Sequence, residues 1–327
     1  MLTSFAKTHI GQRTTNEDFV LVDKKLGLYI VADGVGGLEK GDIASKIASQ
    51  KVKKCIKKGK DLDYSVYEAH GALVDQIESN NSKQGMATTI AAVLFTGNNY
   101  QISWVGDTRV YLWDGKLKLL TKDDSYVEYL LKHGLIDTNE LETHPDRHII
   151  SQALGMRRKE VTINSNSGTL EKNQVLLICS DGLYSIANET VIANELSLQK
   201  EMTHLTEKLV KIAVENNGID NISLISIKSN DNTIPQDEPI KPHVVREFEF
   251  ELKPDNLENT VRTIDKEETD LDLIDITKLQ ELTKKEKDLL ESAALTSQKK
   301  NRGTNYIFPI ALIVIIVLIG VLLYFSR

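Results

Sequence analysis

Six aspartates lie where predicted strands end or where glycine-bounded turns begin, so the fold can bring several carboxylates into one cleft. They are Asp18, Asp33, Asp107, Asp123, Asp181 and Asp220. If Asp33, Asp181 and Asp220 converge, their charges repel and raise one another's pKa, which destabilises an unpaired cluster. A hard divalent cation such as Mg²⁺ or Mn²⁺ removes this repulsion, because it takes carboxylate, carbonyl and water oxygens as ligands. The seven histidines and two cysteines show no zinc-like spacing.

Two cations held in this way favour chemistry at phosphorus. Such a pair lowers the pKa of a bridging water and holds both ends of an in-line displacement. Arg13 fits the same chemistry, because its planar guanidinium can hold a phosphate dianion with two hydrogen bonds. A cysteine-based route is disfavoured, since Cys179 lies inside an apolar strand with no arginine six residues after it. We interpret Cys179 as a buried structural thiol.

The stretch Leu28–Gly37 positions the first of these acids. An apolar run of strand length ends at Asp33, and glycines follow directly. We expect a buried strand to carry Asp33 to its open end, and the glycines to let the backbone turn tightly there. The pattern recurs at Val175–Gly182, where a strand ends at Asp181. Each alone is an ordinary Asp-Gly turn, but the two together favour a shared site.

The elements around these strands come in blocks. Helices are predicted at 42–57, 65–78, 125–133 and 200–216, and strands at 19–22, 28–32, 86–95, 100–105, 109–113, 116–120, 161–164, 175–180 and 222–227. Short turns join the middle strands, which indicates antiparallel pairing. Blocks of strands and helices, rather than strict alternation, favour an α+β layered fold over a doubly wound sheet.

Charge and cysteine content exclude several classes of protein. The chain has 327 residues and a formal net charge of −7, and residues 229–300 hold 11 Lys/Arg against 18 Asp/Glu. The preceding part is therefore close to neutral, which disfavours a nucleic-acid partner. Lysines at 51–58 occupy one face of a predicted helix, and we interpret them as a solvated face. Two cysteines make a disulfide framework improbable and suit a reducing compartment.

Residues 1–228 contain a series of short motifs, which are Gly11-x-Arg13-x-x-Asn16-Glu17-Asp18, Ala32–Gly37, Gly85–Thr89, Val105–Tyr111, Leu120–Ser125, His144-Pro145, Ala153–Gly155, Ser180–Leu183 and Asp220–Ser223. In this order they resemble the motifs of the metal-dependent Ser/Thr protein phosphatases of the 2C type, the PPM family, in their bacterial form. Each motif alone is weakly specific, and their order is what makes the resemblance specific. The resemblance implies a four-layer α-β-β-α sandwich, in which two antiparallel sheets are flanked by helices.

The resemblance also implies roles for single residues. It implies two metals, Mn²⁺ or Mg²⁺, with Asp33 bridging them and with the Gly34 carbonyl, Asp181 and Asp220 as direct ligands. Glu17 and Asp18 are expected to hold metal-bound water, and Asp123 to bind a third metal more weakly. Arg13 is expected to bind the phosphate of the substrate. Asp107 and Asn221 are expected to order their turns by hydrogen bonds to nearby backbone. Residues 144–168 match the family's flap beside the site. Val35 replaces the histidine proposed as general acid in animal members, so a metal-bound water or Asp123 would protonate the leaving group. Ala87 and Asp124 also depart from the pattern.

The chain after residue 228 differs in composition. We interpret residues 229–304 as an acidic, largely flexible linker, with a strand possible at 245–252 and a short helix at 276–290. Residues 305–327 are predicted to form a transmembrane anchor, because the 19 residues from Ile307 to Phe325 carry no charge and just span a bilayer core at about 1.5 Å per residue. Lys299, Lys300 and Arg302 precede this run, which orients the long N-terminal part toward the cytoplasm.

The sequence therefore predicts a tail-anchored, single-pass protein that hydrolyses phosphoserine and phosphothreonine on proteins at the cytoplasmic face of a membrane. Its expected partners are phosphorylated proteins near the membrane and a Ser/Thr kinase that opposes it. The competing interpretation is a catalytically silent docking module with the same fold. Loss of the metal-binding acids would favour that module, and all of them are present.

Overall fold

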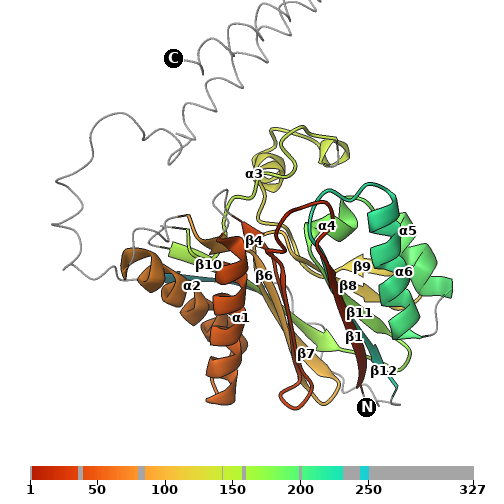
Figure 1. Cartoon of the computed structure of the whole chain (residues 1–327), viewed down its shortest axis with the longest axis horizontal. Coiled ribbons are helices and arrows are strands. Elements are labelled where there is room, and N and C mark those ends of the chain that lie inside the picture. The colour runs from red at the N-terminus through yellow and green to blue at the C-terminus, as the bar shows by residue number, and fades with distance from the viewer. Residues whose placement is uncertain are drawn as a thin grey trace, which may run out of the picture. The chain divides into compact units, whose positions relative to one another are not determined.

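The computed structural model describes residues 2–35, 40–79, 85–141, 143–156, 160–198 and 201–230, and the backbone of 244–249 (Figure 1). None of the helices in these ranges combines the length and apolar character needed to cross a bilayer. The predicted helix at 276–290 and the predicted anchor at 305–327 lie outside the described residues.

Two antiparallel sheets make up the centre of the molecule. The six-stranded sheet has the order β13-β10-β7-β6-β3-β2, with strands β13 (Val244–Glu249), β10 (Glu160–Thr169), β7 (Asn99–Val105), β6 (Ile90–Thr96), β3 (Leu28–Ala32) and β2 (Phe19–Asp23). The five-stranded sheet has the order β1-β12-β11-β8-β9, with strands β1 (Leu2–His9), β12 (Ile222–Ser229), β11 (Val175–Cys179), β8 (Arg109–Trp113) and β9 (Leu117–Leu119). A two-stranded ladder pairs β4 (Gly34–Val35) with β5 (Ala87–Thr88).

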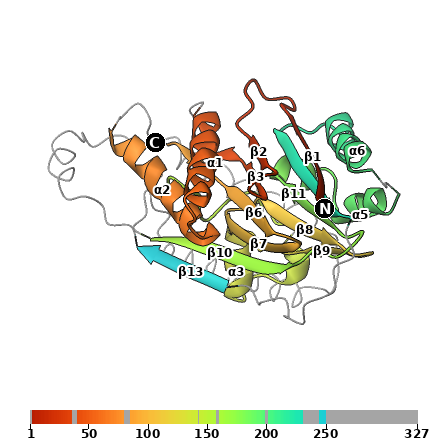
Figure 2. The same ribbon diagram turned by 90° about the horizontal axis from the view of Figure 1, so that it is seen from below.

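Helices cover the outer face of each sheet (Figures 1 and 2). They are α1 (Gly41–Lys57) and α2 (Leu62–Ser79) on the six-stranded sheet, and α4 (Asp181–Tyr184), α5 (Glu189–Leu198) and α6 (Met202–Glu215) on the five-stranded sheet. Strand β3 shows how the layers form. Its Ile30 packs in the cluster with α1 and α2, while Val31 packs in the cluster between the two sheets. Because strand side chains alternate, β3 is buried on both faces.

The predicted α+β class with two antiparallel sheets is confirmed. Helix α3 (Tyr126–Lys132) also falls where it was predicted, and Ser125 caps it by accepting a hydrogen bond from the Glu128 backbone N–H. One prediction is wrong in part: the strand predicted at 86–95 is interrupted at Thr89. The Thr89 N–H donates to the Asp33 carbonyl at 2.8 Å, so the chain leaves one ladder there before it joins the next.

Two further differences concern the second half of the domain. Strand β10 confirms the strand predicted at 161–164, and residues 160–168 of the flap implied at 144–168 therefore belong to a strand. Helix α5 was not predicted, and it buries Ile192 and Leu196 against the five-stranded sheet. A 3₁₀ turn at Thr138–Glu140 interrupts the segment predicted to be irregular.

Strand β13 extends the six-stranded sheet past the predicted domain boundary at residue 228. It pairs antiparallel with β10 along the register from Glu160↔Glu249 to Ser165↔Val244. The strand expected near 245–252 therefore exists, and it lies at the edge of the sheet. Among the described residues, both sheets, including β13, belong to one compact unit.

Candidate active site

The two sheets bring five of the six aspartates into mutual electrostatic contact. They are Asp18 before β2, Asp33 after β3, Asp107 between β7 and β8, Asp181 at the start of α4, and Asp220 before β12. Burial raises the pKa of Asp33 well above its ordinary value, and the charges of the other four raise it further. Sequence analysis predicted that Asp33, Asp181 and Asp220 would meet, and the structure places them together.

The neighbouring carboxyl groups are also perturbed. Burial raises the pKa of Asp18 to about 7, against hydrogen bonds that lower it, and the charges of Asp181 and Asp220 add to the rise. Burial and the charge of Asp181 raise the pKa of Asp107 to about 8. Because these groups bind protons more tightly in the folded state than in the unfolded one, holding them ionised at neutral pH opposes folding.

Two carboxylate oxygens in this group test whether a cation fits. Asp18 Oδ1 and Asp181 Oδ1 are buried and accept no hydrogen bond from the described residues. Buried acceptors without a donor are costly, and a hard divalent cation is the ligand that satisfies several of them at once. The donor set therefore has the chemistry of a Mg²⁺ or Mn²⁺ site.

The acidic side chains are not arranged as the ligands of a bound metal ion would be. Among the residues that the structure describes, no three acidic, histidine or cysteine side chains are grouped so that they could hold a metal ion. Asp220 is held by Arg13, whose Nη2 donates to Asp220 Oδ2 at 2.8 Å. This hydrogen bond raises the pKa of Arg13. The Asn221 N–H donates to Asp220 Oδ1 at 2.8 Å, so both carboxylate oxygens of Asp220 have hydrogen-bond partners.

The loop that carries Arg13 is held against the turn before β12. Gly11 adopts a φ of +61°, and a Cβ added there would overlap the Asp220 carbonyl oxygen. Asn221 completes the contact: its side-chain amide donates to the carbonyls of Ile10 at 2.9 Å and Thr15 at 3.0 Å, and its Oδ1 accepts from the Glu17 N–H at 2.7 Å. Asn221 was expected to order its own turn, but its side chain instead holds the loop of Arg13, 204 to 211 positions away in the sequence. Arg13 remains 55% exposed, within reach of a substrate from solvent.

Glu17 and Gly34 lie where helix α1 begins. The Gly34 N–H donates to the Glu17 carbonyl at 3.2 Å, and Glu17 Oε1 accepts from the Gly41 N–H at 3.3 Å. A Cβ on Gly34 would overlap the Gly41 backbone, so glycine lets the strand end and the helix start pass at close range. Burial raises the pKa of Glu17. These two residues therefore line the same end of the sandwich as Asp33.

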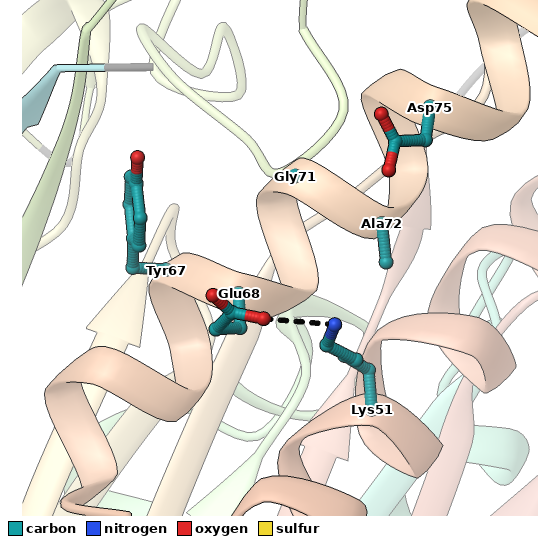
Figure 3. A pocket seen from close by; sticks show the side chains of 6 residues that line it. All are labelled: Lys51, Tyr67, Glu68, Gly71, Ala72 and Asp75. Carbon is teal, nitrogen blue, oxygen red and sulfur yellow. Dashed lines mark ion pairs between the residues drawn. The ribbon is translucent and has the colours of Figure 1, made fainter. Parts of the chain in front are cut away.

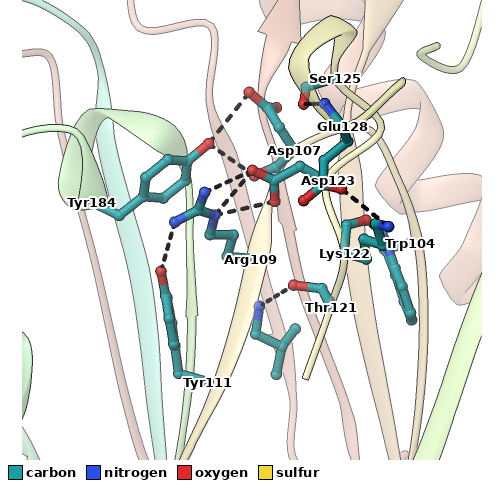
Figure 4. Close-up of polar contacts among 11 residues, drawn as sticks. Trp104, Asp107, Arg109, Tyr111, Thr121, Lys122, Asp123, Ser125, Glu128 and Tyr184 are labelled. Atoms are coloured by element: carbon teal, nitrogen blue, oxygen red, sulfur yellow. Dashed lines mark hydrogen bonds and ion pairs between the residues drawn. The ribbon is translucent and has the colours of Figure 1, made fainter. Parts of the chain in front are cut away.

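Asp123 has a different environment from the one predicted. Arg109 Nη2 donates to Asp123 Oδ2 at 2.7 Å, and Arg109 Nε donates to both carboxylate oxygens at 3.1 Å (Figure 4). Arg109 also donates to the Tyr111 hydroxyl at 3.0 Å and stacks 3.9 Å from the Tyr184 ring centroid. Both oxygens of Asp123 are thus engaged, and its assignment to a third metal site stays a prediction.

Asp107 is linked to Arg109 through Tyr184, whose ring stacks on the guanidinium. The Tyr184 hydroxyl donates to the Asp107 carbonyl at 3.1 Å and lies 3.3 Å from Asp107 Oδ2 (Figure 4). The chain of contacts from Asp107 through Tyr184 to Arg109 and Asp123 borders the acid group. Sequence analysis assigned Asp107 to its turn alone and did not predict this connection.

Gln152 is a site neighbour that sequence analysis missed. Its Nε2 donates to Asp124 Oδ2 and to the Thr162 carbonyl, both at 2.8 Å. Asp124 also accepts from the Gly106 N–H at 2.8 Å and from the Asn164 amide at 3.0 Å. Asp124 was noted only as a departure from the family pattern. Its role is to join the segment before β10 to the turn before β8.

A hollow of about 140 Å³ lies elsewhere, along the seam between α1 and α2 (Figure 3). It is lined by Lys51, Tyr67, Glu68, Gly71, Ala72 and Asp75 and contains none of the predicted site residues. Lys51 pairs with Glu68 there at 2.9 Å, and Lys53 pairs with Asp23 at 3.0 Å. These contacts fit the interpretation of the helix lysines as a surface face.

The family described as "Protein phosphatase 2C" matches residues 6–221. The serine/threonine protein phosphatase PstP of Mycobacterium tuberculosis is 32% identical over 235 residues, which cover 70% of this chain and 45% of that protein. The chain thus spans less than half the length of that relative. Protein phosphatase PhpP of Streptococcus pneumoniae is 29% identical over 237 residues, which cover 68% of this chain and 96% of that protein.

Solved structures of bacterial serine/threonine phosphatases also align with this chain. The crystal structure of the Mycobacterium tuberculosis phosphatase PstP/Ppp aligns with a TM-score of 0.65 at 30% identity, over 70% of this chain and 99% of that one. The PstP catalytic domain in complex with two manganese ions aligns with a TM-score of 0.63 at 28% identity, over 70% of this chain and 99% of that one.

Proposed function

Because the chain belongs to the protein phosphatase 2C family, we propose that it hydrolyses phosphoserine and phosphothreonine on proteins with the help of two divalent cations, Mn²⁺ or Mg²⁺. The observation that carries the proposal is the buried acid group beside Arg13, with Asp18 Oδ1 and Asp181 Oδ1 left without hydrogen-bond donors. The relative that was solved with two manganese ions supports the choice of cofactor.

Different residues of the chain would bind the cations and the phosphate. Asp33, Asp181, Asp220 and the Gly34 carbonyl would hold the cations, with Asp18 and Glu17 contributing through water. Bound there, the cations would supply an activated water and charge neutralisation at the phosphate. Arg13 would exchange Asp220 for the phosphate of the substrate, since it is half-exposed and presents a planar pair of donors.

The cysteines of this chain are poorly placed to act as nucleophiles, which favours direct hydrolysis without a covalent enzyme intermediate. Cys55 and Cys179 are both buried. Burial raises the pKa of Cys179 to about 12, so its thiol stays protonated at neutral pH and is a poor nucleophile.

Phosphate release from a phosphothreonine peptide tests the proposal. We expect the full chain in detergent to release phosphate with Mn²⁺ and with Mg²⁺, and to lose at least about 99% of that activity when EDTA removes them, because the proposed activation of water depends on the cations. A matched incubation with EDTA followed by excess Mn²⁺ controls for irreversible loss. Absence of release in either metal, from protein that is folded by circular dichroism, would favour the docking-module alternative.

The membrane location forms a separate part of the proposal. The uncharged run from Ile307 to Phe325, preceded by Lys299, Lys300 and Arg302, supports a tail anchor with the phosphatase domain on the cytoplasmic side. Substrates and an opposing Ser/Thr kinase at the same membrane would then be present at high effective concentration. We expect the full chain to sediment with membranes and to resist carbonate extraction, whereas a chain ending at residue 302 stays in the supernatant. Full extraction of the intact chain by carbonate would contradict the anchor.

A further inference from the structure

Strand β13 is an element that the family match does not include. The match ends at residue 221, whereas β13 spans Val244–Glu249. It pairs only with the N-terminal half of β10, from residue 160 to residue 165 (Figure 2). Strand β13 therefore forms an edge of the six-stranded sheet and lies outside the residues that the family match covers.

The opposite side of this half of β10 is held by a side chain. Among the described strands, β7 pairs with β10 only from Asn164 onward. Beyond the end of β7, the Gln152 side chain forms hydrogen bonds with the backbone of β10. Its Nε2 donates to the Thr162 carbonyl at 2.8 Å, and its Oε1 accepts from the Thr162 N–H at 3.2 Å. Thr162 thus turns its backbone groups toward Gln152. Because successive strand residues turn their backbone groups to opposite sides, Val161 and Ile163 turn theirs toward β13.

The Gln152 contact continues to the acid group. Gln152 and Asn164 both donate to Asp124, which accepts from the Gly106 N–H. Gly106 is followed by Asp107, and Asp124 follows Asp123. The Ser151 N–H also donates to the Asp124 carbonyl at 2.7 Å. The first half of β10, the segment before it and the turns that carry two acids therefore form one hydrogen-bonded unit.

We propose that the outer edge of β10 is a docking surface whose occupant is the chain's own segment Val244–Glu249, and that its docking holds Gln152 and the turns of Asp107 and Asp123 in place. Without β13, residues 160–163 keep only the Gln152 side chain as a lateral partner among the described residues. The segment that follows the family domain then controls turnover at the site. The effect on turnover rests on the proposed phosphatase function, but the docking itself does not.

The alternation of β13 provides a matched pair of variants. Its pairing of Arg246 with Ile163 and of Glu247 with Thr162 turns the Arg246 N–H toward β10 and the Glu247 N–H away from it. Proline lacks this N–H and is tolerated in an edge strand only where the N–H faces outward. Arg246→Pro therefore removes a donor to β10, whereas Glu247→Pro places the same residue type one position away and keeps that donor.

The test compares both variants with the parent in the full chain by hydrogen exchange and by phosphate release. For Arg246→Pro we expect faster amide exchange in residues 150–156 and 160–165, including Thr162, and turnover with Mn²⁺ lowered about 3- to 30-fold. Glu247→Pro should match the parent in both measurements. Equal exchange in the two variants would overturn the docking. Faster exchange confined to 160–165, with turnover unchanged, would overturn the control of the site. If the parent itself lacks phosphatase activity, the exchange comparison alone still decides the docking.

Discussion

The Asp33→Asn protein should fold like the parent and release phosphate from a phosphothreonine peptide about a thousandfold more slowly. Asp33 is buried and surrounded by the charges of Asp18, Asp181, Asp107 and Asp220, which places it at the centre of the acid group. An amide keeps the shape of the carboxyl group but loses the charge that a divalent cation requires. The measurement is kcat with saturating Mn²⁺, together with the urea unfolding midpoint.

The unfolding midpoint separates a catalytic effect from a folding effect. Removing one of several buried, mutually repelling carboxylates should leave the free energy of unfolding of the metal-free protein unchanged or raise it. Asp114→Asn is the matched control, because Asp114 lies in a hairpin turn and pairs with Lys118 on the surface. That variant should keep its turnover within about twofold of the parent. A folded Asp33→Asn protein with turnover within tenfold of the parent would refute the assignment of Asp33.

Arg109→Met should lower the free energy of unfolding by about 3–5 kcal/mol, the usual cost of removing one partner from a buried ion pair. Arg109 and Asp123 have side chains 23% and 12% exposed, and Arg109 donates to both oxygens of Asp123. Methionine fills a similar volume, but it leaves the Asp123 carboxylate near Asp107 without a counter-charge. Urea unfolding in EDTA measures the loss directly, because no cation then replaces the arginine.

The control for this prediction is an exposed ion pair of the same kind. Lys118→Met removes the partner of Asp114, and since the Lys118 side chain is 53% exposed the expected loss is below about 1 kcal/mol. The double variant Arg109→Met, Asp123→Asn should recover part of the stability, because the remaining group is then neutral. If Arg109→Met costs no more than Lys118→Met, the pair contributes little, and Asp123 is free to act elsewhere.

Local patterns were enough to predict much of the fold. Strands such as β3 and β11 are uninterrupted apolar runs, and each is buried on both faces because it lies between a helix layer and the other sheet. Helix α5 was missed because only two of its residues are buried, so its sequence carries a weak helical period. The break at Thr89 depends on the Asp33 carbonyl, which is distant in sequence, and no local pattern reports such a contact.

In the candidate site, too, the residues could be predicted from local patterns and their contacts could not. The acids could be predicted because each one ends a strand or opens a turn in a recognisable order. The hydrogen-bond partners of the site residues could not be predicted in this way. Arg13 meets Asp220 across 207 positions, and Gln152 meets both Asp124 and Thr162 because of how β10 is placed beside β7. Contacts of this kind follow from sheet order and register, which residue patterns alone leave open.

The pairing of β1 with β12 has a consequence for the order in which the protein is made. Residues 2–9 lie beside residues 222–229, and the Asn221 side chain holds the loop of Arg13 from 206 positions away. A ribosome that adds about 5–20 residues per second has finished β1 at least ten seconds or so before β12 emerges. During that time the first strand waits with an open edge, and the loop of Arg13 has nothing to close against. The nascent chain therefore acquires its working site in a single late event, when nearly the whole domain has left the ribosome.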